Sequence, residues 1–377
     1  MDLWRAQTDA LRSRGPVGWS KKSGGHWVVV DHEYVRRAAL DWQTFSSLHD
    51  TSGECLIAKG IGIPPLAFPL ILSESDPPLQ QERRKIEQPF FHPSEVKRWE
   101  PVIQRHVADA VEMLRGRGRG DLFSDLAMPV VAKTVFELVG IDVDRWTQFT
   151  LSSASAGADL SGEIDRVHGM LGEVVAERRR APRSDIVSAL ARGEVGGRLM
   201  RDDEIVSMLS ALVLGGFDTT SGLITCALIW LDEHRAAHAQ LRADPALLAN
   251  AMDEFLRVYP SSLGVGRTAM RDVEFGGCQI ARGDRVFLSW AAANRDPKVF
   301  EAPHEVRLDR PNAAQNLSFG AGGHRCLGSG LARLMGRAAV SAVLEHLPDY
   351  RIDHAGLQRY ASRGVVRGWV AVPAVMT

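Results

Sequence analysis

A long apolar segment between Ile205 and Leu231 constrains the fold of this 377-residue chain more than any other feature. Its apolar residues recur at helical spacing, and a helix of about thirty residues is roughly 45 Å long, which spans a domain of this size. Gly, Thr and Asp218 interrupt the segment, and a membrane span tolerates such breaks poorly. We therefore expect a buried core helix, capped by Asp202 or Asp203, around which the chain encloses a cavity.

The rest of the chain predicts further helices and a few short strands. Apolar spacing favours helices at 94–114 and 126–139, and Asp244-Pro245 predicts the start of a helix that ends before Pro260. β-Branched runs and a glycine pair predict strands at 26–30, 273–275, 278–280, 286–288 and 364–372. We expect a mainly α fold with small β-sheets (α+β), in a single domain of residues 1–377.

Composition excludes several classes of protein. Lys and Arg number 45 against 46 Asp and Glu, so no global field draws the chain to nucleic acid or to a membrane surface. The four cysteines are widely spaced and form no CxxC pair, which argues against a disulfide scaffold. Residues 1–5 lack the basic start and apolar run of a signal peptide. We expect a cytoplasmic protein with neither nucleic acid nor membrane as a partner.

A glycine-rich segment from Phe319 to Gly330 is the strongest chemical signal in the chain. Its glycines allow a tight turn and the close approach of a flat ligand, and Cys326 falls just before a predicted helix. Main-chain N–H groups at such a position stabilise a thiolate, which an axial haem ligand requires. A buried, inert thiol is the common alternative for a lone cysteine. A phosphate loop or a zinc site lacks its motif here.

Several motifs together resemble the cytochrome P-450 family of haem-thiolate monooxygenases. Phe319-Gly-x-Gly-x-His324-x-Cys326-x-Gly328 resembles the family's haem-binding signature. The other motifs follow the family's order along the chain: Asp76-Pro77-Pro78, Gly215-Gly216-Phe217-Asp218-Thr219-Thr220, Glu254-x-x-Arg257 and Asn294-Arg295-Asp296-Pro297. The resemblance implies the cytochrome P-450 fold, with haem b (iron protoporphyrin IX) between the long central helix and the helix after the cysteine loop. Its axial thiolate, the metal ligand, would be Cys326.

The resemblance also implies roles for residues outside the cysteine loop. Glu254 and Arg257 would form a buried structural network with Arg310. The haem propionates would contact His324, Arg267 and Arg84. Many relatives place histidine four residues before that last arginine, and Gln80 stands here instead, so that contact is weaker or replaced. The cysteine-loop residues expected at the cofactor are Phe319, Gly320 and Gly328.

Two residues of the central helix are the catalytic candidates. Gly215, Gly216, Asp218 and Thr219 are poor formers of a helix interior, so we expect the hydrogen-bond ladder to open there. In the family this gap faces dioxygen, so Thr219 would hold the oxygen with its waters and Asp218 would relay protons from solvent. The alternative for Thr219 is a hydroxyl that bonds back to a main-chain carbonyl.

Substrate contacts are expected on apolar positions around the same gap. These positions are Ala211, Leu214, Gly215, Leu263, Val265, Val365 and the wall from Ile61 to Ile71. Their character predicts a mainly apolar organic substrate oriented by few polar groups. The stretch from Trp146 to Arg180 is shorter than the usual lid helices, which favours an open pocket and a bulky or carrier-attached substrate.

The resemblance implies a monooxygenase that inserts one oxygen atom of O2 into an organic metabolite, by hydroxylation, epoxidation, demethylation or oxidative coupling. Secondary metabolism is the expected setting. No flavin or iron–sulfur motif occurs, so electrons would come from a ferredoxin and its reductase. Basic residues expected at that docking face are Arg83, Arg84, Lys85, Lys97, Arg98 and Arg325. Alternatives are a peroxygenase or isomerase on the same fold, and a haem carrier or sensor.

Overall fold

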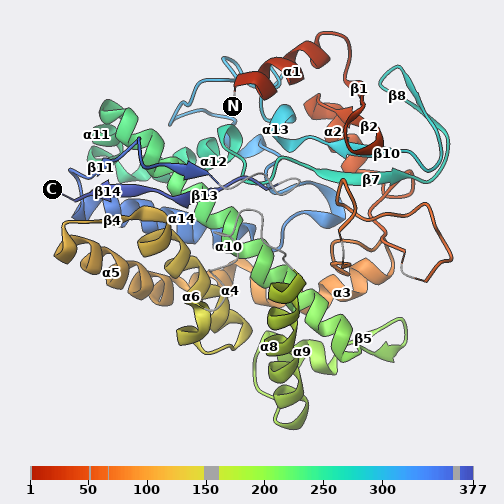
Figure 1. The fold of residues 1–377 in the computed structure, drawn as a ribbon, viewed down its shortest axis with the longest axis horizontal. Helices are drawn as coiled ribbons and strands as arrows, with labels where there is room; N and C mark the ends of the chain where they lie inside the picture. Colours follow the sequence, from red (N-terminus) through yellow and green to blue (C-terminus); the bar gives the residue numbers. More distant parts are fainter. Residues whose placement is uncertain (1, 51, 67, 148–160, 360–365, 377) are drawn as a thin grey trace.

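The computed structural model describes residues 2–50, 52–66, 68–147, 161–359 and 366–376 (Figure 1). A single long helix, α10 (Asp202–Glu233), runs through the middle of the molecule. The other helices are α1 (Asp2–Arg12), α2 (His32–Leu40), α3 (Leu79–Glu87), α4 (Pro93–Arg98), α5 (Glu100–Arg117), α6 (Met128–Val139), α8 (Ser161–Arg180), α9 (Ile186–Arg192), α11 (Arg235–Ala243), α12 (Leu248–Val258), α13 (Trp290–Ala293) and α14 (Ser329–His346).

Short strands form small sheets beside the helices. A five-stranded sheet has the order β1-β2-β10-β7-β3, with β2 and β10 parallel and the other pairs antiparallel. A three-stranded sheet, β11-β14-β4, and three two-stranded pairs complete the described strands. The strands are β1 (Val17–Ser20), β2 (His26–Val29), β3 (Phe45–Ser46), β4 (Arg119–Asp121), β5 (Glu194–Val195), β6 (Arg198–Leu199), β7 (Val265–Ala269), β8 (Val273–Phe275), β9 (Cys278–Ile280), β10 (Arg285–Leu288), β11 (Arg351–Ile352), β12 (Gln358–Arg359), β13 (Trp369–Ala371) and β14 (Pro373–Val375).

The central helix α10 confirms the main expectation from the sequence. It packs against α6, α8 and α14, and although it is long and apolar enough to cross a bilayer, most of that apolar stretch is buried inside the fold. Its start differs from the prediction, because Arg201 is the N-cap residue and Glu204 Oε2 accepts the Arg201 N–H at 2.8 Å. Neither Asp202 nor Asp203 caps it; both are already helical.

The helix is also continuous through its glycine pair, so the expected opening of the hydrogen-bond ladder is wrong. The two glycines instead leave space beside the helix, because they have no side chain. A Cβ at Gly216 would lie 3.2 Å from Val135 Cγ2, so glycine permits close packing against α6. A Cβ at Gly215 would meet nothing within 4 Å. The poor helix formers therefore leave room on one face without breaking the main chain.

Local signals explain most other elements. The hairpin of β8 and β9 turns on Gly276 and Gly277, whose φ values of 62° and 79° suit glycine. Asp244 accepts the Ala246 N–H at 3.1 Å, and α12 ends at Val258 before Pro260. One boundary was wrong, because the helix expected at 94–114 divides into α4 and α5 around Trp99, with proline in the first turn of α5.

A buried carboxylate on α12 joins this helix to the segment that leads to the cysteine loop. Glu254 accepts hydrogen bonds from Arg257 Nε at 2.7 Å, Arg257 Nη2 at 2.8 Å and Arg310 Nε at 2.8 Å. Arg257 Nη1 also donates to the carbonyls of Asn294 and Pro303. Glu254 and Arg257 are fully buried, which confirms the network that the sequence predicted, with Arg310 as its third member.

Substitution of Glu254 by Gln should destabilise the fold strongly, because it leaves two buried guanidinium groups without their anion. The expected loss is about 3–5 kcal/mol in the free energy of unfolding, measured by urea denaturation. Glu301→Gln is the matched control, since Glu301 forms an exposed ion pair with Arg307 at 3.4 Å. The control should change by less than ~0.5 kcal/mol. Equal effects of the two substitutions would contradict the proposed importance of the buried network.

Candidate active site

A cavity of about 340 Å³ lies between α10 and the cysteine loop. On one side it is bounded by the turn that contains Phe319, Cys326 and the start of α14. On the other side α10 presents Ala211, Leu212, Gly215, Gly216, Thr219, Thr220 and Leu223. The two strongest motifs of the sequence therefore face each other across one space, as the resemblance implied.

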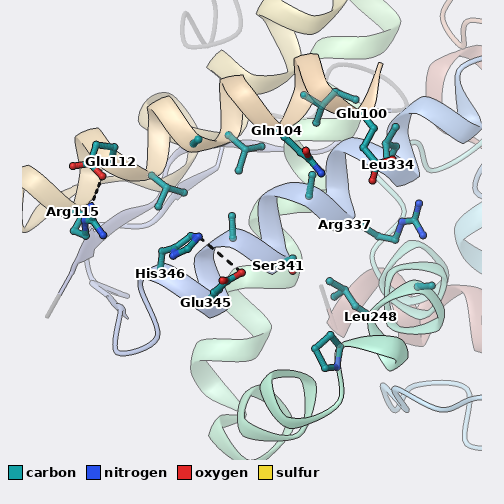
Figure 2. A pocket seen from close by; sticks show the side chains of 18 of the residues that line it. Glu100, Gln104, Glu112, Arg115, Leu248, Leu334, Arg337, Ser341, Glu345 and His346 are labelled. Carbon is teal, nitrogen blue, oxygen red and sulfur yellow. Dashed lines mark hydrogen bonds and ion pairs between the residues drawn. The ribbon is translucent and has the colours of Figure 1, made fainter. Parts of the chain in front are cut away.

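A larger groove of about 730 Å³ lies elsewhere, between α5, α14 and the start of α12. Figure 2 shows two pairs of neighbouring polar side chains among its lining residues, Glu112 with Arg115 and Glu345 with His346. None of the motif residues with proposed chemistry lines it. By size alone, this groove would be chosen as the candidate active site. The arrangement of the reactive side chains favours the smaller cavity instead.

The cysteine loop holds Cys326 in a tight turn. Gly320 and Gly322 have φ values of 71° and 70°, a region that side chains rarely adopt, and the Cys326 N–H donates to the Phe319 carbonyl at 2.8 Å. Burial raises the pKa of the Cys326 thiol, while the Gly328 N–H that bonds the sulfur, and nearby arginines, oppose this. The sulfur thus has a preformed donor, and a bound metal would complete its conversion to a thiolate.

Two guanidinium groups and an imidazole line the cavity beside this loop: Arg84, Arg267 and His324. Nε2 of His324 is buried without a hydrogen-bond partner, and the other ring nitrogen bonds the main chain of Ser75. Burial, followed by the charges of Arg267 and Arg84, lowers the pKa of His324 to about 3. Burial lowers the pKa of Arg267 to about 10. At pH 7 the His324 imidazole is therefore neutral, and Arg84 and Arg267 carry the positive charge of this wall.

The nearby carboxyl groups compensate this charge only in part. Glu87 is fully buried on α3, and burial raises its pKa to about 8, so it is mainly neutral at pH 7 and leaves Arg84 unbalanced. Asp76 acts on Arg267 but also accepts hydrogen bonds from the Ser46 hydroxyl and the Ser47 N–H. A flat ligand with two carboxylates would satisfy the cations, which is what a haem presents. The residues present fit that group.

Gln80 has a different role from the expected propionate contact. Its Nε2 donates to the Gly323 carbonyl at 2.9 Å, and its Oε1 is buried without a partner. Arg84 Nη2 similarly donates to the Arg325 carbonyl at 2.7 Å. Both side chains lie at the cavity, and both also support the cysteine loop from α3.

Across the cavity, the Thr219 hydroxyl donates to the Gly215 carbonyl at 2.8 Å. This is the back-bonded arrangement that the sequence left as an alternative. The Thr219 carbonyl accepts from Ser261 Oγ at 2.8 Å, so the turn after α12 is attached to the same point of α10. Asp218 is half-buried and is not among the residues that line the cavity.

The substrate positions predicted from sequence divide into three groups. Ala211, Gly215, Val265 and Ile61 line the cavity, whereas Leu214 and Leu263 do not. Val365 lies outside the described residues, as do residues 148–160 of the stretch expected to form a short lid. Sequence reasoning missed several lining residues: Leu72, Ser73, Thr220, Leu256, Ser261, Ser262 and Trp290. Ser261 and Ser262 could have been found from the sequence. They directly follow Pro260, and the helix that ends before this proline was already predicted.

The opposite side of the cysteine loop carries basic residues. A groove of about 590 Å³ is lined by Arg84, Lys97, Arg325 and Arg337 together with Cys326. Lys85, Lys97 and Arg325 are exposed, as predicted. Arg83 is a correction, because it is buried with Nη2 3.7 Å from Glu204 Oε1 and is absent from this surface. It instead connects α3 to the start of α10.

Comparison with known proteins agrees with this geometry. The family model described as Cytochrome P450 matches residues 153–348. Cytochrome P450 130 of Mycobacterium tuberculosis is 30% identical, covering 98% of this chain and 94% of its own length. Linalool 8-monooxygenase of Pseudomonas putida is 29% identical, with 86% and 84% covered.

Solved structures give the same result. HmtN, a post-tailoring hydroxylase involved in himastatin biosynthesis, superposes with a TM-score of 0.85 at 27% identity, covering 96% of this chain and 94% of the other. The ligand-free structure of cytochrome P450 TbtJ1 gives 0.86 at 27% identity, covering 100% and 98%. The chain belongs to the cytochrome P450 family and is an oxidoreductase of the monooxygenase type.

Proposed function

We propose that this protein is a haem-thiolate monooxygenase that inserts one oxygen atom of O2 into a mainly apolar organic metabolite. The observation that carries the proposal is the placement of Cys326, two arginines and His324 on one wall of a cavity, with Thr219 on the facing wall. A thiol, a site for two carboxylates and a hydroxyl on the far side are the groups that haem-thiolate oxygen chemistry needs.

The family motifs, together with this geometry, support a proposal for the residues that would hold haem b. Cys326 would bind the iron, while His324, Arg84 and Arg267 would receive the two propionates. Phe319, Gly320 and Gly328 belong to the turn against which the macrocycle would lie, and Gln80 supports that turn through Gly323. The bound haem supplies the redox chemistry on O2. The propionates would also supply the negative charge that Arg84 and Arg267 lack.

Thr219 and Asp218 are proposed to deliver protons. The Thr219 hydroxyl is committed to the Gly215 carbonyl, and a rotation about its side-chain bond would direct the proton into the cavity. Asp218, half-buried beside it, would receive protons from solvent and pass them to the Thr219 oxygen. Gly215 leaves open space next to this hydroxyl, because no atom lies within 4 Å of where its Cβ would be.

The cavity walls favour an apolar substrate with few polar anchors. Leu72, Leu212 and Val265 supply apolar surface, and Ser73 and Ser262 are among the few polar residues that line this space. Hydroxylation, epoxidation, demethylation and oxidative coupling all begin from such a substrate. Biosynthetic tailoring is the proposed setting, since HmtN acts in himastatin biosynthesis.

The proposal is tested by turnover under ¹⁸O2 with a ferredoxin, its reductase and NADH, after a panel of apolar metabolites has been screened for displacement of haem-bound water. One labelled oxygen atom should appear in the product. Turnover with hydrogen peroxide alone, and none with the electron donors, would contradict the proposal and favour a peroxygenase.

In the same assay, Thr219→Ala should retain haem and substrate binding but lower product formed per electron pair. Loss of a positioned proton donor costs on the order of 10²-fold in general acid catalysis. Thr225→Ala is the matched control, because Thr225 also donates to a carbonyl one turn earlier, Ser221 O at 2.8 Å, yet is buried away from the cavity. Thr219→Ser, which keeps the hydroxyl, should restore the yield of product per electron pair. An equal yield of product per electron pair in the two alanine variants would show that Thr219 has no role in proton delivery.

Electrons are proposed to enter through an acidic ferredoxin docked on the basic groove beside Cys326. Lys97→Glu should slow ferredoxin association on the order of tenfold at low ionic strength, because it reverses a charge that steers the encounter. The difference from wild type should shrink as salt is added. Lys21→Glu is the control, an exposed lysine between β1 and β2, which lie away from α4 in Figure 1. A salt-independent rate in the wild type would contradict this docking site.

A further inference from the structure

Part of the cavity wall is an irregular loop between β3 and α3. We name residues 57–66 and 68–72 the wall loop; its described residues contain neither helix nor strand. Ile61 and Leu72 of this loop line the cavity. A loop without regular main-chain hydrogen bonds must have its polar groups satisfied elsewhere if it is to hold an apolar side chain at a fixed place.

Glu74 satisfies main-chain donors at both ends of the wall loop. This carboxylate is buried, with 2% exposure. Its Oε1 accepts the Ile61 N–H at 2.8 Å, and its Oε2 accepts the Leu70 N–H at 3.0 Å and lies 3.0 Å from His49 Nδ1. One side chain therefore draws together two points of the loop that are nine residues apart, and hydrogen bonds to a charged acceptor are stronger than neutral ones.

Arg285 on β10 satisfies the carbonyls on either side of Ile61. Its Nη2 donates to the carbonyls of Gly60 and Gly62 at 2.7 Å each, and Nη1 donates to Thr268 Oγ1 at 2.6 Å. Burial lowers the pKa of Arg285 to about 10, and the charge of Glu74 opposes this. The guanidinium thus holds the main chain from one side while the carboxylate holds it from the other.

The main chain of the loop is shaped for these two partners. Gly60 has a φ of 66°, and a Cβ there would lie 2.1 Å from Glu74 Oε1. The Ile61 carbonyl accepts the Gly266 N–H at 2.7 Å, and the Gly266 carbonyl accepts from Arg267 Nη1 at 2.8 Å. The wall loop is therefore connected to the residue proposed to bind a propionate.

A third attachment fixes the other end of the loop to the central helix. Ser207 Oγ of α10 donates to the Pro69 carbonyl at 2.8 Å and accepts the Ile71 N–H at 3.1 Å. With both ends attached, the loop is a preformed wall, and its position relative to α10 determines the width of the cavity.

We infer that Glu74 and Arg285 form a clamp that fixes Ile61 at the cavity wall and thereby determines which bulky apolar substrates the enzyme accepts. They are positioning residues, since they act through the wall loop. The inference rests on the proposed function in taking the cavity as the substrate site. The ligand class it concerns is apolar molecules large enough to extend from the iron to Ile61.

The test uses the full-length holoenzyme and two azoles that bind haem iron, imidazole and 4-phenylimidazole. In Glu74→Gln and Arg285→Lys, the dissociation constant of 4-phenylimidazole should rise about fivefold, the effect of one net hydrogen bond, while that of imidazole changes less than about twofold. Amide hydrogen exchange of a peptide covering residues 58–63 should accelerate about tenfold. Glu54→Gln and Arg282→Lys, at exposed positions, are the matched controls and should match the wild type.

Two outcomes would overturn the clamp: unchanged exchange at 58–63, or an equal loss of affinity for both azoles. The reduced carbon monoxide spectrum of each variant shows whether its haem site is intact. If Arg285→Lys does not fold, Ser207→Ala provides a milder variant that should accelerate exchange at 68–72 and weaken 4-phenylimidazole alone. Absence of haem in the wild type would contradict the proposed function, and the exchange data would still test the clamp.

Discussion

The hydrogen bond from the Cys326 N–H to the Phe319 carbonyl fixes the position of one sulfur atom, and the functional account depends on that position. The turn is closed by glycines at positive φ and is held from α3 by Gln80 and Arg84. Behind it, the Glu254 network attaches α12 to the segment that enters the loop. The buried ion pairs of Glu254 thus hold the segments behind the cysteine loop, and the loop places the Cys326 thiol at the cavity.

Electrostatics distinguishes the two ends of this site. Beside the cysteine loop, cationic groups outnumber ionised carboxylates, so a dianionic ligand would be stabilised there. Toward the wall loop the charges balance, because Glu74 and Arg285 satisfy the main chain between them. One end of the cavity is therefore suited to bind a charged cofactor, and the other is suited to exclude water and hold an apolar molecule.

Sequence predicted those features that local signals determine. The apolar run of α10, the glycine pair of the β8–β9 hairpin and the Asp244 and Pro260 boundaries of α12 were confirmed. The family motifs added Arg310 as the partner of Glu254, although 56 residues separate them. Contacts between residues far apart in the sequence were predicted correctly where a family motif identified both partners.

Features that depend on tertiary contacts were not predicted. The start of α10 is set by Glu204, which also pairs with Arg198, and Arg83 is buried because it reaches the same carboxylate. The close approach of Gly216 to Val135 of α6 is likewise a contact between distant parts of the chain. Glu74 and Arg285 belong to no sequence motif. Their role depends on the wall loop, which lies between them only in the folded protein.

The most direct test of the central claim is the absorption spectrum of the purified, reduced protein under carbon monoxide. We predict the strongly red-shifted band of a thiolate-ligated haem, which Cys326→Ser should abolish and Cys55→Ser should leave intact. The spectrum of an imidazole-ligated haem protein, or a protein with no pigment, would contradict the account.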